Sequence, residues 1–314
     1  LAHLGADVVR LESPEHPCLF RRLPFSPPDV EPNADSSGLF HNYNSDKRSV
    51  GIDLGHPAAR DIVMQLVAVS DVVVDNFGVG VMEQLGFGAE DLRQINPDII
   101  VVSLSGYGQN GPSANYMAYG PAGGSAAGLY AANGYGPGDA LETGVAVGDP
   151  GTGLTAAWAT VAALVARRRT GVAARVDVAM VEAVAATVGE LWMEYSSTGR
   201  DPDPRGNRDP AYAPHGCYRA LGDDRWITIA CPDDSAWTAL CGVLGGSLLN
   251  DERYSTAELR KLHEDELDES ISAATGEHDR WELTHRLQAV GVAAFPSLSP
   301  LDLWAGDPQL EALG

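Results

Sequence analysis

The apolar positions of this chain form short β-branched runs and helical stripes that alternate along the first half of the sequence. Runs bounded by turn residues predict three strands at Val8–Leu11, Val72–Asp75 and Ile99–Leu104. Apolar residues at helical spacing predict helices at Pro57–Val69 and Glu90–Ile95. Alternation of apolar strands with helices is typical of a parallel sheet that is covered on both faces. The pattern therefore predicts a doubly wound, mostly parallel, Rossmann-like α/β domain.

The second half of the chain has a different pattern, because a segment rich in proline, aspartate and arginine at Gly199–Pro214 predicts a linker. A long predicted helix, Val181–Ser197, leads into it. One strand and three helices are predicted beyond it, at Trp226–Ala230, Ser235–Leu244, Ala257–Ala274 and Asp279–Val290. The expected division is a large domain at 1–198, a linker at 199–214, a small α+β domain at 215–298 and, at 299–314, the start of a return to the large domain.

Composition narrows the class of protein. The formal net charge of −22 argues against nucleic acid or an anionic membrane as a partner. No apolar run approaches the roughly 20 residues that a membrane-spanning helix needs, and the first residues lack the features of a signal peptide. The cysteines and histidines show no metal-ligand spacing. We therefore expect a cytoplasmic protein without a metal site.

Candidate chemistry is clearest at Asp149, which stands at the start of a long helix of small apolar residues. Gly148 and Gly151 permit tight backbone geometry, Pro150 suits the first helical turn, and Gly171 marks the helix end. Such a carboxylate can cap the helix by accepting the free amides of its first turn. It can also act as a nucleophile, because a helix N-terminus favours negative charge and a glycine-lined turn leaves room for an acyl group.

Six sequence blocks follow one another along nearly the whole chain, at Leu4–Pro14, Asn42–Leu54, Asp71–Phe87, Leu92–Pro112, Val147–Gly153 and Gly206–Ala230. Together they resemble the class III coenzyme A (CoA) transferase family of the CaiB/BaiF type, which includes formyl-CoA transferases and 2-methylacyl-CoA racemases. The resemblance implies that acyl-CoA is a substrate, with no permanently bound cofactor. It also implies a strand before Leu1, a continuation after Gly314, and a homodimer interlocked through the linkers around Ser197–Pro214.

The resemblance makes Asp149 the catalytic nucleophile. It implies that CoA contacts two loops, through Ile52 and Asp53 in one and Asn76, Phe77, Gly78 and Gly80 in the other. Lys47 and Arg48 are further candidates, since local positive charge must offset the acidic background where phosphates bind. Glycine amides that could stabilise the oxyanion of each carbonyl addition are those of Gly123, Gly124, Gly148 and Gly151.

These features predict a CoA-transferase that moves CoA from an acyl-CoA thioester to a carboxylic acid through aspartyl anhydride and aspartyl thioester intermediates. A racemase of the same fold is one alternative. Racemases of this fold carry Gly-His where this chain has Gly120 and Pro121, and proline cannot exchange a proton. The other alternative is a non-catalytic CoA-binding subunit of a larger complex, which the intact turn around Asp149 disfavours.

Overall fold

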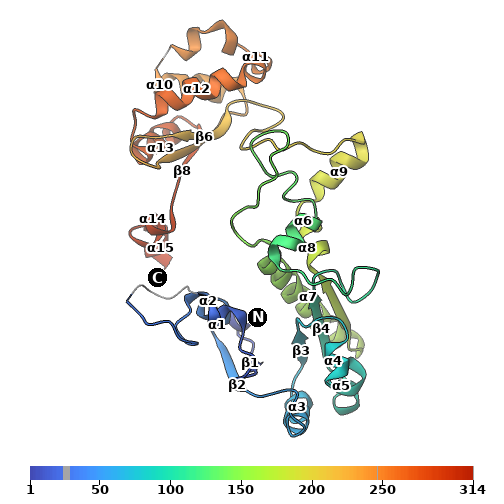
Figure 1. The fold of residues 1–314 in the computed structure, drawn as a ribbon. Coiled ribbons are helices and arrows are strands. Elements are labelled where there is room, and N and C mark those ends of the chain that lie inside the picture. The colour runs from blue at the N-terminus through green and yellow to red at the C-terminus, as the bar shows by residue number, and fades with distance from the viewer. Residues whose placement is uncertain (24–28, 246, 314) are drawn as a thin grey trace. The chain divides into compact units, whose positions relative to one another are not determined.

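The computed structural model describes residues 1–23, 29–245 and 247–313, which form two compact units (Figure 1). The first unit comprises Leu1–Ala131 and Glu142–Pro202, and the second comprises Ala132–Leu141 and Asp203–Gly314. The division at Pro202 falls inside the linker predicted at 199–214. Residues 299–314 are grouped with the second unit, and their return to the large domain stays a prediction.

The first unit contains two parallel sheets. Strand β1 (Val8–Glu12) pairs with β2 (Lys47–Gly51) in the smaller sheet. In the larger one, β4 (Ile100–Ser105) lies between β3 (Val72–Asp75) and β5 (Arg175–Ala179). The predicted α/β class with parallel strands is confirmed.

The side chains of β4 alternate between two hydrophobic clusters, one on each face of the three-stranded sheet. Ile100 packs with residues of α7 (Gly148–Thr170), whereas its neighbour Val101 packs with residues of α3 (Ala59–Ala68) and α5 (Ala89–Ile95). Burial on both faces explains why this strand is a continuous apolar run. The shorter helices of the unit are η1 (Ala2–Leu4), α1 (Leu19–Arg22), α2 (Gly38–Asn44), α4 (Val81–Gln84), α6 (Gly120–Ala126), α8 (Met180–Thr187) and α9 (Gly189–Thr198).

The second unit is α+β and contains an antiparallel sheet. Strand β7 (Trp226–Ala230) pairs with β6 (His215–Arg219) on one side and β8 (Ala293–Ser297) on the other. Its inward side chains, such as the fully buried Ile227, join a core formed with the surrounding helices. The helices that contribute to this core are α10 (Asp234–Leu244), η2 (Leu248–Asn250), η3 (Glu252–Tyr254), α12 (Glu264–Thr275) and α13 (Arg280–Ala289). The unit also contains α11 (Ala257–Leu262), α14 (Pro300–Trp304) and α15 (Pro308–Leu313).

Two predicted helices are each interrupted at a single residue. The helix expected at 181–197 is α8 followed by α9, separated at Val188, where the backbone has φ −111° and ψ 35°. The helix expected at 257–274 is α11 followed by α12, separated at His263 with φ −109° and ψ 33°. The sequence pattern did not mark the break at Val188, because apolar residues continue at helical spacing across it. At His263 the spacing does shift, since Leu262 and Leu267 are five positions apart with only polar residues between them.

Candidate active site

Asp149 lies in the first turn of α7, one residue after the helix begins. The N-cap of this helix is Val147, and no side chain caps it. The predicted capping role of Asp149 was therefore wrong. Its Oδ2 instead accepts a hydrogen bond of 3.0 Å from the backbone amide of Gly120, the first residue of α6. The other predicted end of α7 is correct, since Gly171 takes the left-handed conformation at φ 71° and ends the helix.

The Asp149 side chain combines one fixed oxygen with exposure to solvent. The residue is exposed, and Oδ1 accepts no hydrogen bond from any residue in the described part of the chain. A carboxylate held by one oxygen has a defined plane, while its second oxygen stays open to an electrophile. This geometry suits a nucleophile better than a buried structural acid.

The four candidate oxyanion glycines differ in the availability of their amides. Gly123 donates to the Tyr119 carbonyl at 3.1 Å, and Gly151 donates to the Val147 carbonyl at 3.0 Å. These two amides are used within their helices and are not free to stabilise an oxyanion. Gly148 begins α7 and lies next to Asp149, so its amide stays a candidate.

Two of these glycines have a packing role instead. A Cβ atom built on Gly123 would lie 2.5 Å from the sulfur of Met180 in α8. One built on Gly124 would lie 2.6 Å from Cζ of Tyr130. Both distances are shorter than real contacts of a Cβ atom, so the absence of these side chains is what lets α6 pack closely on its neighbours.

The loop after β3 contains the candidates Asn76, Phe77, Gly78 and Gly80, and a buried carboxyl group shapes its start. Asp75, at the end of β3, is 9% exposed. Its Oδ1 accepts the Phe77 amide at 3.2 Å, and its Oδ2 accepts the Ser103 hydroxyl at 2.8 Å. Burial raises the pKa of the Asp75 carboxyl above its ordinary value, and the hydrogen bond from Ser103 opposes that shift.

Beyond this turn the loop is open to solvent. Asn76, Phe77 and Gly78 are exposed, and Gly80 has φ 78° as the N-cap of α4. Only glycine adopts this conformation readily. The loop therefore presents exposed backbone at the carboxyl end of a parallel strand, where open α/β sheets bind ligands.

The second candidate loop lies at the carboxyl end of β2. The Ile52 amide donates to the Glu12 carbonyl at 2.8 Å, and Oδ1 of Asp53 accepts the Gly55 amide at 3.0 Å. Ile52 packs against the hydrophobic cluster that also receives Met82 of α4. One hydrophobic cluster thus packs against residues at both loops.

Lys47 and Arg48 lie elsewhere. They begin β2, and at a rise of about 3.3 Å per residue Lys47 lies about 13 Å and Arg48 about 10 Å along the strand from its carboxyl end. The Arg48 guanidinium pairs with Asp7. The Lys47 ammonium donates to the Tyr43 carbonyl at 2.8 Å, and burial followed by the charge of Arg10 lowers its pKa. These partners do not favour Lys47 and Arg48 as phosphate ligands, so their CoA-binding role is left without support from the geometry.

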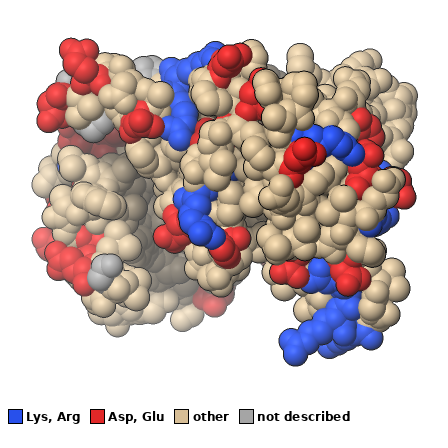
Figure 2. Space-filling model, turned by 90° about the horizontal axis from the view of Figure 1, so that it is seen from below, with Lys and Arg blue, Asp and Glu red and all other residues tan. Residues whose placement is uncertain are grey.

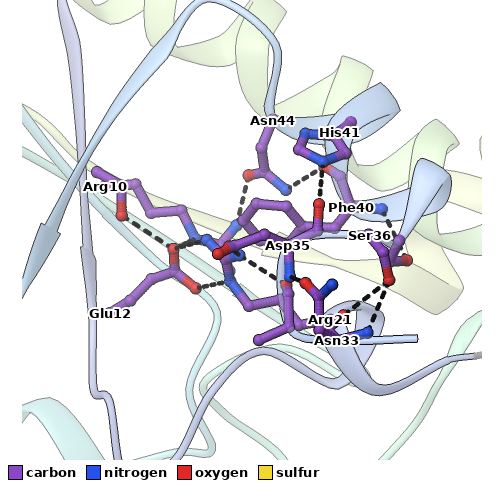
Figure 3. A network of polar contacts seen from close by, with 12 residues as sticks. Arg10, Glu12, Arg21, Asn33, Asp35, Ser36, Phe40, His41 and Asn44 are labelled. Atoms are coloured by element: carbon purple, nitrogen blue, oxygen red, sulfur yellow. Dashed lines mark hydrogen bonds and ion pairs between the residues drawn. The ribbon is translucent and has the colours of Figure 1, made fainter. Parts of the chain in front are cut away.

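Cations near the carboxyl end of β1 are also neutralised within the protein (Figure 3). Arg21 donates twice to Glu12 at 3.0 Å, pairs with Asp35 at 2.7 Å, and stacks over the Phe40 ring at 3.6 Å. Arg10 donates to Asn44 and lies 3.7 Å from the same Glu12. On the face drawn in Figure 2, several basic side chains also lie beside acidic ones, while a larger basic group protrudes at the lower right. Backbone amides of the two loops are thus the better candidates for holding phosphate groups.

A pocket of about 390 Å³ opens beside the loop that follows β3. Its lining includes two polar contacts. Arg175 lies 3.6 Å from Glu83, and Asp177 accepts a hydrogen bond of 2.9 Å from the Gln109 amide. It shares one residue, Gly80, with the candidate CoA loop, and its lining residues are Val79, Gly80, Glu83, Gln109, Asn110, Arg175 and Asp177.

The described residues contain no candidate metal site and no candidate membrane-spanning helix. Across residues 1–23, 29–245 and 247–313, no group of three or more His, Cys, Asp or Glu side chains could hold a metal ion. None of the helices in those ranges is long and apolar enough to cross a membrane.

Two features of the site were missed by sequence reasoning. The Asp75–Ser103 hydrogen bond joins residues at the same level of two adjacent strands. Polar residues within or at the end of apolar strands were a signal that could have found it. The Gly120–Asp149 contact joins a backbone amide to a side chain 29 positions away. Every residue except proline has a backbone N–H group, so the type of residue at position 120 did not reveal this donor.

Comparison with known proteins shows the family to which this chain belongs. The family model described as CoA-transferase family III matches residues 1–314. The chain is 33% identical over 319 residues to the succinate–glutarate CoA-transferase of Agrobacterium fabrum, with 100% of this chain and 78% of the relative covered. It is 33% identical over 300 residues to the acetyl-CoA:oxalate CoA-transferase of Acetobacter aceti, with 95% and 75% covered.

A solved structure shares the fold. A CAIB/BAIF family protein from Brucella suis matches with a TM-score of 0.90 at 32% identity, covering 99% of this chain and 81% of that one. The likeness extends through both units. The chain belongs to CoA-transferase family III.

Proposed function

We propose that this protein transfers CoA from an acyl-CoA thioester to a carboxylic acid through a covalent intermediate on Asp149. The proposal rests mainly on the geometry of that carboxylate, in which Oδ2 is held by the Gly120 amide and Oδ1 is exposed. Family membership supports the reaction class, because the relatives named above are CoA-transferases with carboxylic acids in their names.

The chemistry proceeds by four acyl transfers that balance without a net proton. Oδ1 of Asp149 attacks the thioester carbonyl, the carbon–sulfur bond breaks, and CoA thiolate leaves behind an aspartyl acyl anhydride. The thiolate then attacks Cγ of Asp149, which releases the donor acid and forms an aspartyl-CoA thioester. The acceptor carboxylate attacks that thioester to form a second anhydride and thiolate. Attack of this thiolate on the acceptor carbonyl yields the new acyl-CoA and restores the Asp149 carboxylate.

CoA is assigned to the loops that follow β2 and β3. Their candidate contacts are Ile52 and Asp53 in one and Asn76, Phe77, Gly78 and Gly80 in the other, supported by the position of both loops at carboxyl strand ends. Binding of the nucleotide there would hold the thioester at the carboxylate, so weakening these loops should lower turnover as well as affinity. The Gly148 amide is a candidate for oxyanion stabilisation, and Gly124 keeps its place as a second one.

The environment of Asp149 favours transfer over racemisation. A racemase needs a second group that exchanges a proton with the substrate α-carbon. Helix α6 begins with Gly120, whose amide contacts the carboxylate, and Pro121, and neither residue has a group that can take or give a proton. We also assign the protein as a homodimer interlocked through the segments around Ser197–Pro214, on the family resemblance.

Replacement of Asp149 by asparagine tests the assignment. The amide keeps the size and the oxygen that accepts the Gly120 hydrogen bond, but it is a very weak nucleophile. We expect no CoA transfer and unchanged CoA binding. Asp98→Asn is the matched control, because Arg167 near the far end of α7 donates to the Asp98 carbonyl, about 27 Å along the helix from Asp149. A screen with dicarboxylic acids, beginning with succinate, glutarate and oxalate, supplies the assay. Transfer by Asp149→Asn at the wild-type rate would overturn the proposal.

A further inference from the structure

The start of α7 and the start of α6 meet backbone to backbone. A Cβ atom built on Gly148 would lie 2.7 Å from the carbonyl oxygen of Gly120 and 2.8 Å from its Cα. Real Cβ atoms do not approach other atoms so closely, so the contact exists because Gly148 has no side chain. This contact fixes where Gly120 lies relative to the residue that follows Gly148, which is Asp149.

Position 120 also requires glycine, because the Asp149 side chain occupies the space that a larger residue would need. A Cβ atom built on Gly120 would overlap Oδ2 of Asp149, and it would lie 3.2 Å from Cγ of Asp149 and 3.0 Å from the Cβ of Ala146. The φ angle of Gly120 lies outside the left-handed region, so backbone conformation does not demand glycine there. The demand comes from the space that the carboxylate occupies.

We propose that Gly120 is the positioning residue of the nucleophile, an inference that rests on the function proposed above. Its amide holds Oδ2 at 3.0 Å, and the position where a side chain would begin is filled by the carboxylate itself. An amide-to-carboxylate hydrogen bond is charge-assisted and directional. It sets the plane of the carboxylate and so directs Oδ1 towards the thioester carbonyl.

The role predicts a large effect on turnover and a small one on binding. Nucleophilic attack needs the reacting atoms about 3–3.5 Å apart and aligned, and a misplacement of about 1 Å can cost about 100-fold in rate. A methyl group at position 120 keeps the amide donor but displaces the carboxylate from its place. The loops assigned to CoA follow β2 and β3 and include no residue of α6, so CoA affinity should be preserved.

Gly120→Ala is the first test, with kcat, KM and the dissociation constant of CoA all measured. We expect kcat to fall about 100-fold while the dissociation constant changes by less than about threefold. A purely structural role would instead lower the active fraction and the stability together. The rate at which acyl-CoA and hydroxylamine modify Asp149 should fall by the same factor as kcat.

Two further variants separate positioning from overpacking. The double variant Gly120→Ala/Ala146→Gly removes the contact with Ala146 but not the overlap with Asp149, so it should recover stability without recovering kcat. Gly106→Ala is the matched overpacking control, because its new Cβ would lie 2.6 Å from the Cβ of Ala118 and its three nearest atoms all belong to that residue. We expect it to lower stability and to keep kcat within about twofold of wild type.

The outcomes distinguish this inference from the function on which it rests. If wild type forms the Asp149 adduct and folded Gly120→Ala turns over within about threefold of it, the positioning role is wrong. The same holds if the double variant regains wild-type kcat. If wild type forms no adduct while it transfers CoA, the proposed function fails, and the positioning role fails with it.

Discussion

The buried carboxyl group of Asp75 gives a quantitative test of how the CoA loop is built. Replacement by alanine removes the acceptor of two hydrogen bonds, from the Phe77 amide and from the Ser103 hydroxyl. The hydroxyl belongs to a residue that is only 5% exposed, so leaving it unpaired costs about 1–3 kcal/mol. The Phe77 amide lies in an exposed loop and can bond to water at a smaller cost. We expect Asp75→Ala to lower the free energy of unfolding of the first unit by about 2–3 kcal/mol.

Replacement by asparagine should behave in the opposite way. Its side-chain oxygen can accept the Phe77 amide, and its NH₂ group can donate to the Ser103 oxygen, so both contacts are kept. Like alanine, it removes the cost of burying a charge, so the two variants differ in the two hydrogen bonds and not in charge. Because burial raises the pKa of Asp75 in the folded state above its ordinary value of 3.8, the folded state binds the proton more tightly than the unfolded chain. Stability from this group is thus greatest below that value and is lost as pH rises through the folded pKa.

Urea unfolding of the two variants over a series of pH values is the assay. The contribution of Asp75 to stability should fall as pH rises above 3.8, so the free energy of unfolding of Asp75→Asn relative to wild type should increase with pH over that range. Ser103→Ala removes a hydrogen bond that holds the pKa down, so it should move the fall to higher pH. CoA affinity should drop in Asp75→Ala and persist in Asp75→Asn. An asparagine variant that is as unstable as the alanine variant, or that keeps the wild-type slope, would refute the reasoning.

Three further predictions concern charge, packing and assembly. The hydrogen bond from Arg21 lowers the pKa of Glu12 below its ordinary value of 4.5, so this contact stabilises the fold above that pH and is lost as pH falls through the folded pKa; Glu12→Gln should flatten acid unfolding in that range. Arg260 is 1% exposed and donates to two backbone carbonyls and to Asp234, so Arg260→Met should destabilise the second unit by about 2–4 kcal/mol in chemical unfolding, and an unchanged midpoint would contradict this. An interlocked dimer through Ser197–Pro214 should persist on dilution to nanomolar concentration in sedimentation, whereas a rapidly reversible monomer–dimer equilibrium would exclude it.

Strands could be predicted from the sequence where buried positions are occupied by apolar residues. Val72–Asp75 and Trp226–Ala230 match their predicted bounds because β-branched residues face a core. β2 was not predicted, since all five residues of Lys47–Gly51 are exposed and carry no apolar alternation. β8 contains Pro296, which favours an edge position and weakens the strand signal.

The residues of the candidate site also differ in how well the sequence predicted them. Asp149 was found because helix-start residues surround it, although its exact place in the first turn depends on the contact with Gly120. Lys47 and Arg48 were chosen by charge and by their place in a block of the family resemblance, and the structure places them at the amino end of a strand whose carboxyl end carries the loop. The position of a charge along a strand follows from the strand's direction, which is fixed by tertiary pairing with β1.

The central claim is that Asp149 carries the acyl group and then CoA. Its most direct test is to mix the whole protein with acyl-CoA and hydroxylamine, digest it, and analyse the peptides by mass spectrometry. Hydroxylamine captures an aspartyl thioester as the hydroxamate. We predict modification of the peptide that contains Asp149, dependent on acyl-CoA and absent from Asp149→Asn. An unmodified Asp149 in a sample that is transferring CoA, or an adduct on another residue, would contradict the account.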